Sequence, residues 1–338
     1  MPDFIIVLIV VLCVAVIFCT LMFAFALYAL KEGFGGRFDK NKYLKYFSAE
    51  DFNLNVLPVE TADGKVVLRG NIYWRGELSK SAALVIFSHG MGPGQCAYTT
   101  EISRFCDSGF AVLAFDCAGS GLSDGKRLGG LEASTRALVA AAQFAASDER
   151  LKNFKTFYAG HSMGAYSSLC AAAFIKPCGA VAFAAPERPA AIVEHNAAQA
   201  AGRFVAKLLR PFVGAVLKLR FGRYGNMSAS RAVCSSGVPA VIFHGDCDTV
   251  VPIGCSAYAA ADCPNAERVL CSGKGHNPYN TFAAEKLLKE LGGAVMSAEK
   301  TDPQKRDEYF ASVDYRAVCE EDDSVMQAAV DFIKKCLK

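Results

Sequence analysis

Hydrophobic residues are distributed along this chain in two different ways. Residues 4–30 form one apolar run of 27 residues without a charged side chain. A helix of that length rises about 40 Å, more than the roughly 30 Å of a bilayer's hydrocarbon core. From Asn55 onward, short apolar runs alternate with helical patterns instead. We therefore expect a transmembrane helix followed by a globular domain.

The globular part alternates between strand and helix patterns. Two strands, 55–60 and 65–74, flank a turn at Ala62–Gly64, and six short apolar runs follow them at 82–88, 111–116, 156–160, 180–184, 240–244 and 266–270. Helical patterns lie at 99–108, 130–146, 164–175, 281–291 and 323–338. Continuous apolar strands that alternate with helices are typical of a mostly parallel sheet covered on both faces. The predicted class is α/β.

Composition agrees with this organisation. A hydrophobic share of 52% excludes a disordered chain, and the positive mean hydropathy of +0.23 is due to the apolar run. We expect a short tail at 1–3, a transmembrane helix at 4–30 and a basic juxtamembrane linker at 31–50. The domain then spans 51–338, with a helical cap at about 187–237.

The sequence around the apolar run favours a retained single-pass anchor over a cleaved signal peptide. The chain starts Met1-Pro2-Asp3, without a basic region, and the run exceeds the 7 to 15 apolar residues typical of a signal. Residues 31–45 carry five basic and two acidic side chains, whereas no basic residue precedes the run. The positive-inside rule then predicts a cytoplasmic domain.

Cysteine usage is consistent with that compartment. The chain has 14 cysteines, but no spacing suggests a disulfide framework, a CxxC pair or a zinc site. We therefore expect reduced and mostly buried thiols.

The predicted cap is basic and amphipathic. Residues 187–237 hold eight basic and two acidic side chains. The apolar residues between Phe204 and Leu217 share one side of a helical wheel, and Pro211 is expected to break the helix. Two interpretations remain open: a helix packed on the domain with a solvated basic face, and a lid that also contacts anionic lipid.

The clearest chemical motif is Gly160-His161-Ser162-Met163-Gly164, which lies between an apolar strand and an alanine-rich helical pattern. A GxSxG sequence in that context places the serine on a sharp strand-to-helix turn, where flanking side chains would clash. Ser162 is the candidate nucleophile, and Gly160 and Gly164 support its turn.

Three further segments complete a catalytic constellation. His89-Gly90-Met91-Gly92 follows an early strand, and backbone N–H groups of Met91 and Met163 are candidates for an oxyanion hole. His244-Gly245-Asp246-Cys247-Asp248 and Gly273-Lys274-Gly275-His276 follow two later strands. His276 is the candidate base, and Asp248 is preferred to Asp246 as its acidic partner. The other histidines, including His89, are expected to be structural.

These motifs, in this order, resemble the α/β-hydrolase superfamily, and more narrowly the monoacylglycerol lipase, lysophospholipase and serine-aminopeptidase-like group. The resemblance runs from about Asn55 to Lys338. It implies a triad of Ser162, Asp248 and His276, an oxyanion hole from Met91 and Met163, and a lid over an acyl pocket. Residues 292–323 are longer and more charged than that core fold requires.

The expected function is a membrane-anchored serine hydrolase that cleaves carboxylic esters, with monoacylglycerol or lysophospholipid as the first candidates. A serine peptidase or amidase is an alternative with the same triad, and a non-catalytic membrane-tethered binding module is another. The expected partners are the lipid bilayer and an ester substrate. We expect no cofactor, no metal and no nucleic acid, since the glycine-rich segment 115–125 lacks nucleotide-binding patterns; the oligomeric state stays open.

Overall fold

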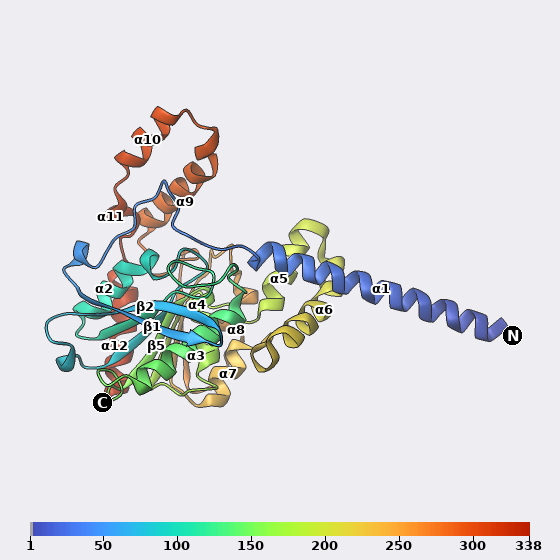
Figure 1. Cartoon of the computed structure of the whole chain (residues 1–338), viewed down its shortest axis with the longest axis horizontal. Helices are drawn as coiled ribbons and strands as arrows, with labels where there is room; N and C mark the ends of the chain where they lie inside the picture. The colour runs from blue at the N-terminus through green and yellow to red at the C-terminus, as the bar shows by residue number, and fades with distance from the viewer. Residues whose placement is uncertain (1–2) are drawn as a thin grey trace.

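The central element of the fold is one twisted, mostly parallel sheet (Figure 1). The computed structural model describes residues 3–338, and its strands follow the order β1-β2-β4-β3-β5-β6-β7-β8. Only the β1–β2 and β2–β4 pairings among these strands are antiparallel. The strands are β1 Asn55–Asp63, β2 Val66–Trp74, β3 Leu84–Ser88, β4 Ala111–Phe115, β5 Thr156–His161, β6 Gly179–Phe183, β7 Ala240–Gly245 and β8 Ala266–Cys271.

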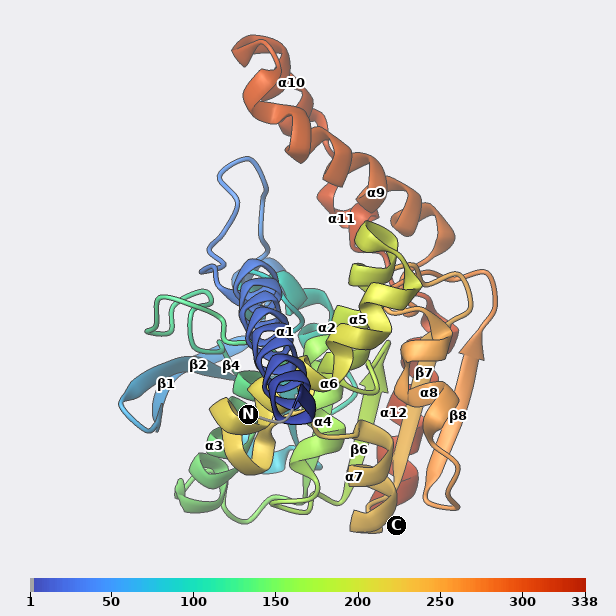
Figure 2. The same ribbon diagram turned by 90° about the vertical axis from the view of Figure 1, so that its right-hand side faces the viewer.

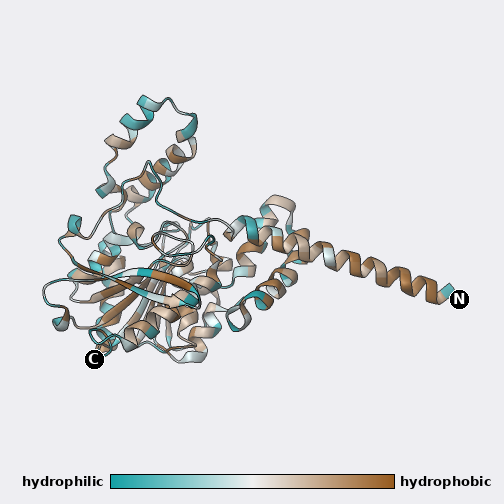
Figure 3. Cartoon of the chain, in the orientation of Figure 1, coloured by the Kyte–Doolittle hydropathy of each residue, from teal (hydrophilic) through white to brown (hydrophobic). Residues whose placement is uncertain are grey.

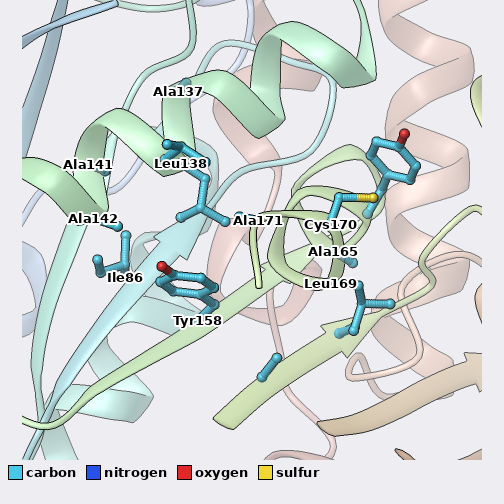
Figure 4. Close-up of a cluster of buried hydrophobic side chains, with 14 of the residues drawn as sticks. Ile86, Ala137, Leu138, Ala141, Ala142, Tyr158, Ala165, Leu169, Cys170 and Ala171 are labelled. Atoms are coloured by element: carbon cyan, nitrogen blue, oxygen red, sulfur yellow. The ribbon is translucent and has the colours of Figure 1, made fainter. Parts of the chain in front are cut away.

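Helices cover both faces of the sheet, as the alternating pattern predicts. One face packs against α3 (Leu131–Ser147), α4 (Met163–Ala171), α7 (Ala229–Ser236) and α8 (Ala257–Ala260). The other face packs against α2 (Thr99–Asp107) and α12 (Asp323–Leu337). Figure 4 shows part of the first layer, where small side chains of α3 and α4 pack close to Ile86 and Tyr158. The mostly parallel α/β architecture expected from the sequence is confirmed.

The predicted transmembrane segment is a single helix, α1 (Asp3–Phe34), of 32 residues. Its outer part projects away from the domain and is continuously apolar (Figure 3). Its inner part lies beside the cap helices α5 (Pro189–Ala201) and α6 (Arg203–Phe221) in Figures 1 and 2. The helix therefore extends about one turn beyond the predicted end and contacts the domain.

The expected break at Pro211 is wrong, because α6 continues through this residue. Phe212, the next residue, packs edge-on against Phe18 and Phe23 of α1 at centroid distances of 6.3 and 5.3 Å. Val213 and Leu217 are buried in the same cluster. Burial of this apolar face on both sides of the proline offsets the missing backbone hydrogen bond.

Residues beyond the core fold form a helical excursion that rises from the domain in Figure 1. It comprises α9 (Phe282–Ser297), α10 (Pro303–Ser312) and α11 (Tyr315–Val318). Tyr43 of the juxtamembrane linker stacks on Phe310 of α10 at 5.3 Å. The excursion thus accounts for the long, charged stretch after His276, and the linker packs against it.

One pair of cysteines contradicts the expectation of reduced thiols. Cys234 of α7 and Cys263, which precedes β8, form a disulfide with a Cα–Cα distance of 5.7 Å. The two residues are 29 positions apart, and only the packing of α7 beside the β7–β8 connection brings them together, so their spacing gave no signal. The other twelve cysteines in the described part of the chain are free.

Candidate active site

Ser162 occupies the strained turn that its motif predicts. It lies between β5 and α4 with φ 54° and ψ −116°, and the positive φ costs energy for a residue with a side chain. Its own N–H donates to the Phe183 carbonyl at 2.8 Å. A Cβ on Gly164 would overlap the backbone of Ser88, and one on Gly160 would lie 2.6 Å from Gly164. Both glycines are therefore required by the close approach of β3.

The structure brings Ser162, His276 and Asp248 together. His276 Nε2 lies 2.9 Å from Ser162 Oγ, and His276 Nδ1 lies 2.8 Å from Asp248 Oδ2. The three residues follow β5, β7 and β8, whose carboxyl ends meet at one edge of the parallel sheet. This arrangement has the geometry of a nucleophile, a general base and an orienting carboxylate.

Asp248, rather than Asp246, is the carboxylate that faces the histidine. Burial acts to raise the pKa of Asp248, but the hydrogen bond with His276 and those from the N–H groups of Val250 and Val251 outweigh it, so the pKa is lowered. These two N–H groups donate to Oδ1 at 2.8 and 2.9 Å, which leaves Oδ2 for the histidine. Asp246 instead accepts the Gly273 N–H at the surface.

The N–H groups of Met91 and Met163 are free to serve as donors. Neither donates a hydrogen bond within residues 3–338, and Met163 is the first residue of α4, where backbone N–H groups have no partner in the helix. Both residues line the same cavity as Ser162. The helix N-terminus at Met163 also favours a developing negative charge.

His89 shapes the loop that carries Met91. Its Nδ1–H donates to the Gly90 carbonyl at 2.6 Å, and its Nε2 accepts the Cys117 N–H at 2.9 Å. This pattern requires a neutral ring. The Gly92 carbonyl accepts a hydrogen bond from Ser120. The sequence expectation that His89, Gly90 and Gly92 support the loop is consistent with these contacts.

A buried link joins the loop after β3 to the loop that carries His276, and the sequence does not predict it. The Gly90 N–H donates to the Tyr98 hydroxyl at 3.0 Å, which donates to His161 Nδ1 at 2.9 Å. His161 Nε2–H then donates to the His276 carbonyl at 2.8 Å. Burial lowers the pKa of His161 to about 3, with the neighbouring His276 as the second cause, so the ring stays neutral. Tyr98 lies in no recognisable motif, and the sequence marks His161 only as the residue before Ser162.

The glycine-rich segment 115–125 has a structural role in this region. Asp116 lies at its start and accepts the N–H groups of Gln95 and Leu122 at 2.7 and 2.9 Å. Its carboxylate thereby joins this segment to the loop after β3. Residues 3–338 contain no group of three or more His, Cys, Asp and Glu side chains placed to hold a metal ion.

Ser162 opens into a mostly apolar cavity of about 410 Å³. Met91, Met163 and the loop 249–251 line it near the triad. Helix α5 supplies one side, and α1 supplies another, through Phe25, Tyr28, Ala29, Gly33 and Phe34. The predicted cap therefore covers the site together with the N-terminal helix.

Comparisons with known proteins agree with this fold. Residues 79–218 match the family model for serine aminopeptidase, S33. The Pyrococcus furiosus esterase Pf2001 is 18% identical, with a TM-score of 0.58 over 89% of this chain and 99% of its own. Est1E from Butyrivibrio proteoclasticus is 16% identical, with a TM-score of 0.52 over 83% of this chain and 98% of its own.

No curated protein matches the sequence. The solved structures share the fold of this chain at low sequence identity, and the family model covers the turn that carries Ser162 and most of the cap. The chain has the α/β-hydrolase fold.

Proposed function

We propose that this protein is a serine hydrolase that cleaves carboxylic esters through an acyl-enzyme. The observation that carries the proposal is His276, which bridges Ser162 and Asp248 at 2.9 and 2.8 Å on the floor of an apolar cavity. Ser162 Oγ attacks the ester carbonyl while His276 takes its proton, and the protonated ring, stabilised by Asp248, then protonates the leaving alcohol.

The remaining steps use the same groups. The N–H groups of Met91 and Met163 stabilise the oxyanion of each tetrahedral intermediate. Water then attacks the acyl-enzyme while His276 takes its proton, and the protonated ring returns that proton to Ser162 Oγ as the bond to the acyl group breaks and the acid leaves. Oxyanion donors of this kind typically contribute about 3 to 4 kcal/mol each to transition-state stabilisation.

Single-chain acyl lipids, such as monoacylglycerol or lysophospholipid, are the proposed substrates. The cavity lies in the size range of small-molecule pockets, at about 410 Å³, and its lining includes Ile192, Val193 and Leu209 of the cap. The similar fold of an esterase, Pf2001, adds support for ester chemistry.

The family description favours a second candidate, because it names a serine aminopeptidase. A serine amidase or peptidase would use the same triad on an amide. A panel of p-nitrophenyl esters of rising chain length, set against aminoacyl amides, separates the two. We expect esters to be cleaved faster, with a preference for longer chains. Faster amide cleavage would contradict the ester proposal.

The Ser162→Ala variant provides the matched control for that panel. We expect it to lose ester hydrolysis by about 10⁴-fold or more, because the acyl-enzyme cannot form. A protein that acts as a tethered binding module would show no serine-dependent hydrolysis and would keep its biological effect in this variant. That outcome would contradict the enzyme assignment.

We also propose that α1 anchors the protein in a bilayer as a single-pass helix. All side chains from Asp3 to Leu21 are exposed although all but Asp3 and Thr20 are apolar or small, and such a surface requires a lipid environment. The packing of residues 22–34 against the cap supports a retained helix over a cleaved signal. Removal of the segment would uncover Leu209 and Val213 of α6.

The basic residues after the helix support a cytoplasmic domain, whereas the Cys234–Cys263 disulfide is typical of oxidising compartments. We keep the cytoplasmic orientation as the proposal. Labelling of intact cells with a membrane-impermeant maleimide tests it through Cys178 and Cys247, which are exposed. We expect labelling only after the membrane is permeabilised. Labelling of intact cells would place the domain outside the cytoplasm.

A further inference from the structure

We propose that the inner part of α1, residues 22–34, forms a wall of the acyl pocket, so that the membrane anchor determines which acyl chains the enzyme accepts. The inference rests on the proposed ester hydrolase function. It assigns a specificity role to Phe25, Tyr28, Ala29 and Gly33, which lie in the predicted anchor or its linker.

The length of α1 supports two separate roles along one helix. Its 32 residues rise about 48 Å, which is more than a hydrocarbon core of about 30 Å requires. The exposed residues 3–21 alone span about 28 Å. The remaining 13 residues, about 20 Å of helix, line the cavity and carry the buried contacts with the cap, to which Phe18 adds one edge-on contact.

Packing fixes the inner part of α1 against the cap. Ala26 and Leu30 are buried, at 0% and 5% exposure, on the side that faces α5 and α6. They pack with Val193 of α5 and Val213 of α6. Ala29 and Gly33, each three residues after one of these buried positions, line the cavity. The same contacts that hold α1 in place therefore direct its neighbouring side chains toward Ser162.

Hydrogen bonds secure the end of α1 to the catalytic domain. The Gly129 N–H donates to the Phe34 carbonyl at 3.3 Å, and the Leu128 N–H donates to the Gly36 carbonyl at 2.9 Å. Arg37 then donates to the carbonyls of Ser123 and Gly125 at 2.9 and 2.8 Å. Residues 22–34 are thus held by side-chain packing against the cap, and the chain directly after them is held by hydrogen bonds to the segment 123–129.

The position of the wall has a consequence for the substrate. The pocket lies where α1 leaves its free, lipid-facing part, so an acyl chain reaches Ser162 along the helix from the bilayer surface. Phe25 and Tyr28 stack at 6.4 Å on this route. A single flexible chain fits such a passage, which favours mono-acyl lipids as the substrate class.

The test compares two equivalent changes on α1 in the full-length protein in nanodiscs. Ala29→Trp places a large side chain in the cavity, whereas Ala24→Trp adds the same group at an exposed position of the same helix that does not line the cavity. We expect Ala29→Trp to lower kcat/KM for a dodecanoyl ester at least about tenfold relative to a butyryl ester. Ala24→Trp should keep the wild-type ratio. A ratio that is the same in both variants would overturn the inference.

A measurement on the wild-type protein does not depend on how the variants fold. A long-chain alkyl fluorophosphonate with a diazirine near the chain end is first attached to Ser162 and then photoactivated. Crosslinks within residues 22–34 are expected, and crosslinks confined to other segments would overturn the inference. Failure of the probe to attach to Ser162 would instead contradict the proposed hydrolase function, so the two failures are distinguishable.

Discussion

The floor and the wall of the cavity are built in different ways. The floor depends on a strained serine turn and on hydrogen bonds of 2.8 to 2.9 Å among three side chains. The wall consists of side chains from α1 and α5, most of them apolar or small, that fill space. Changes to the floor should therefore reduce hydrolysis of every substrate, whereas changes to the wall should alter the choice among substrates.

The largest predicted effect on the floor separates the two aspartates after β7. Asp248→Asn should lower kcat about 10³- to 10⁴-fold for short and long esters alike, because the amide cannot orient and stabilise the protonated His276. Asp246→Asn is the matched control, since Asp246 contacts Gly273 and Ser272 at the surface. Steady-state kinetics measure both. A comparable loss in the two variants would contradict the assignment of Asp248.

A smaller effect is expected from the buried link between the loops. Tyr98→Phe removes the hydroxyl that joins Gly90 to His161, and we expect kcat to fall about tenfold, with KM little changed. Tyr158→Phe removes another buried hydroxyl, which contacts the Ile175 carbonyl away from the site, and should cost stability without this loss of kcat. Equal kcat values in the two variants would mean that the link affects stability alone.

The smallest effect concerns stability and involves two carboxyls, that of Glu101, which is buried, and that of Glu321, which is half-buried. Burial raises the pKa of each carboxyl, and for Glu321 the proximity of Glu101 is the second cause. Because the pKa is higher in the folded state, the folded protein holds a proton that the unfolded chain releases above its ordinary glutamate pKa of about 4.5. The resulting stabilisation is complete below that pH, and it is lost as the pH rises through the folded-state pKa.

Glu101→Gln tests this dependence in thermal unfolding experiments between pH 5 and 9. The wild-type Tm should fall as the pH rises. The Tm of the variant should fall less, with a difference of a few °C. Glu149→Gln, at an exposed position, should follow the wild type. A variant that loses as much stability at high pH as the wild type would exclude Glu101 as the cause.

The placement of the three floor residues was predictable because the sequence signals for it are local. The sequence around Ser162 combines an apolar strand with two glycines, and the segments with Asp248 and His276 follow strands that are parallel neighbours. The choice of Asp248 over Asp246 agrees with the hydrogen bonds in the structure. The strand and helix patterns also predicted the sheet, with ends that differ by a few residues.

The features that escaped prediction all depend on distant contacts. Pro211 was expected to end a helix, but α1 supports the helix on which it lies. The disulfide of Cys234 and Cys263 depends on the packing of α7. The role of residues 22–34 as a cavity wall was hidden because an apolar run that spans a bilayer has the same composition as one that also lines a pocket.

The central claim is that Ser162 is a nucleophile activated by His276. The most direct measurement is treatment of the folded, full-length protein with a small fluorophosphonate probe, followed by peptide mass spectrometry. We expect one modified residue, Ser162, and no labelling in the His276→Ala or heat-unfolded protein. Absence of labelling in the folded protein would contradict the assignment of Ser162 as an activated nucleophile. Equal labelling of protein that is unfolded before treatment would contradict it as well.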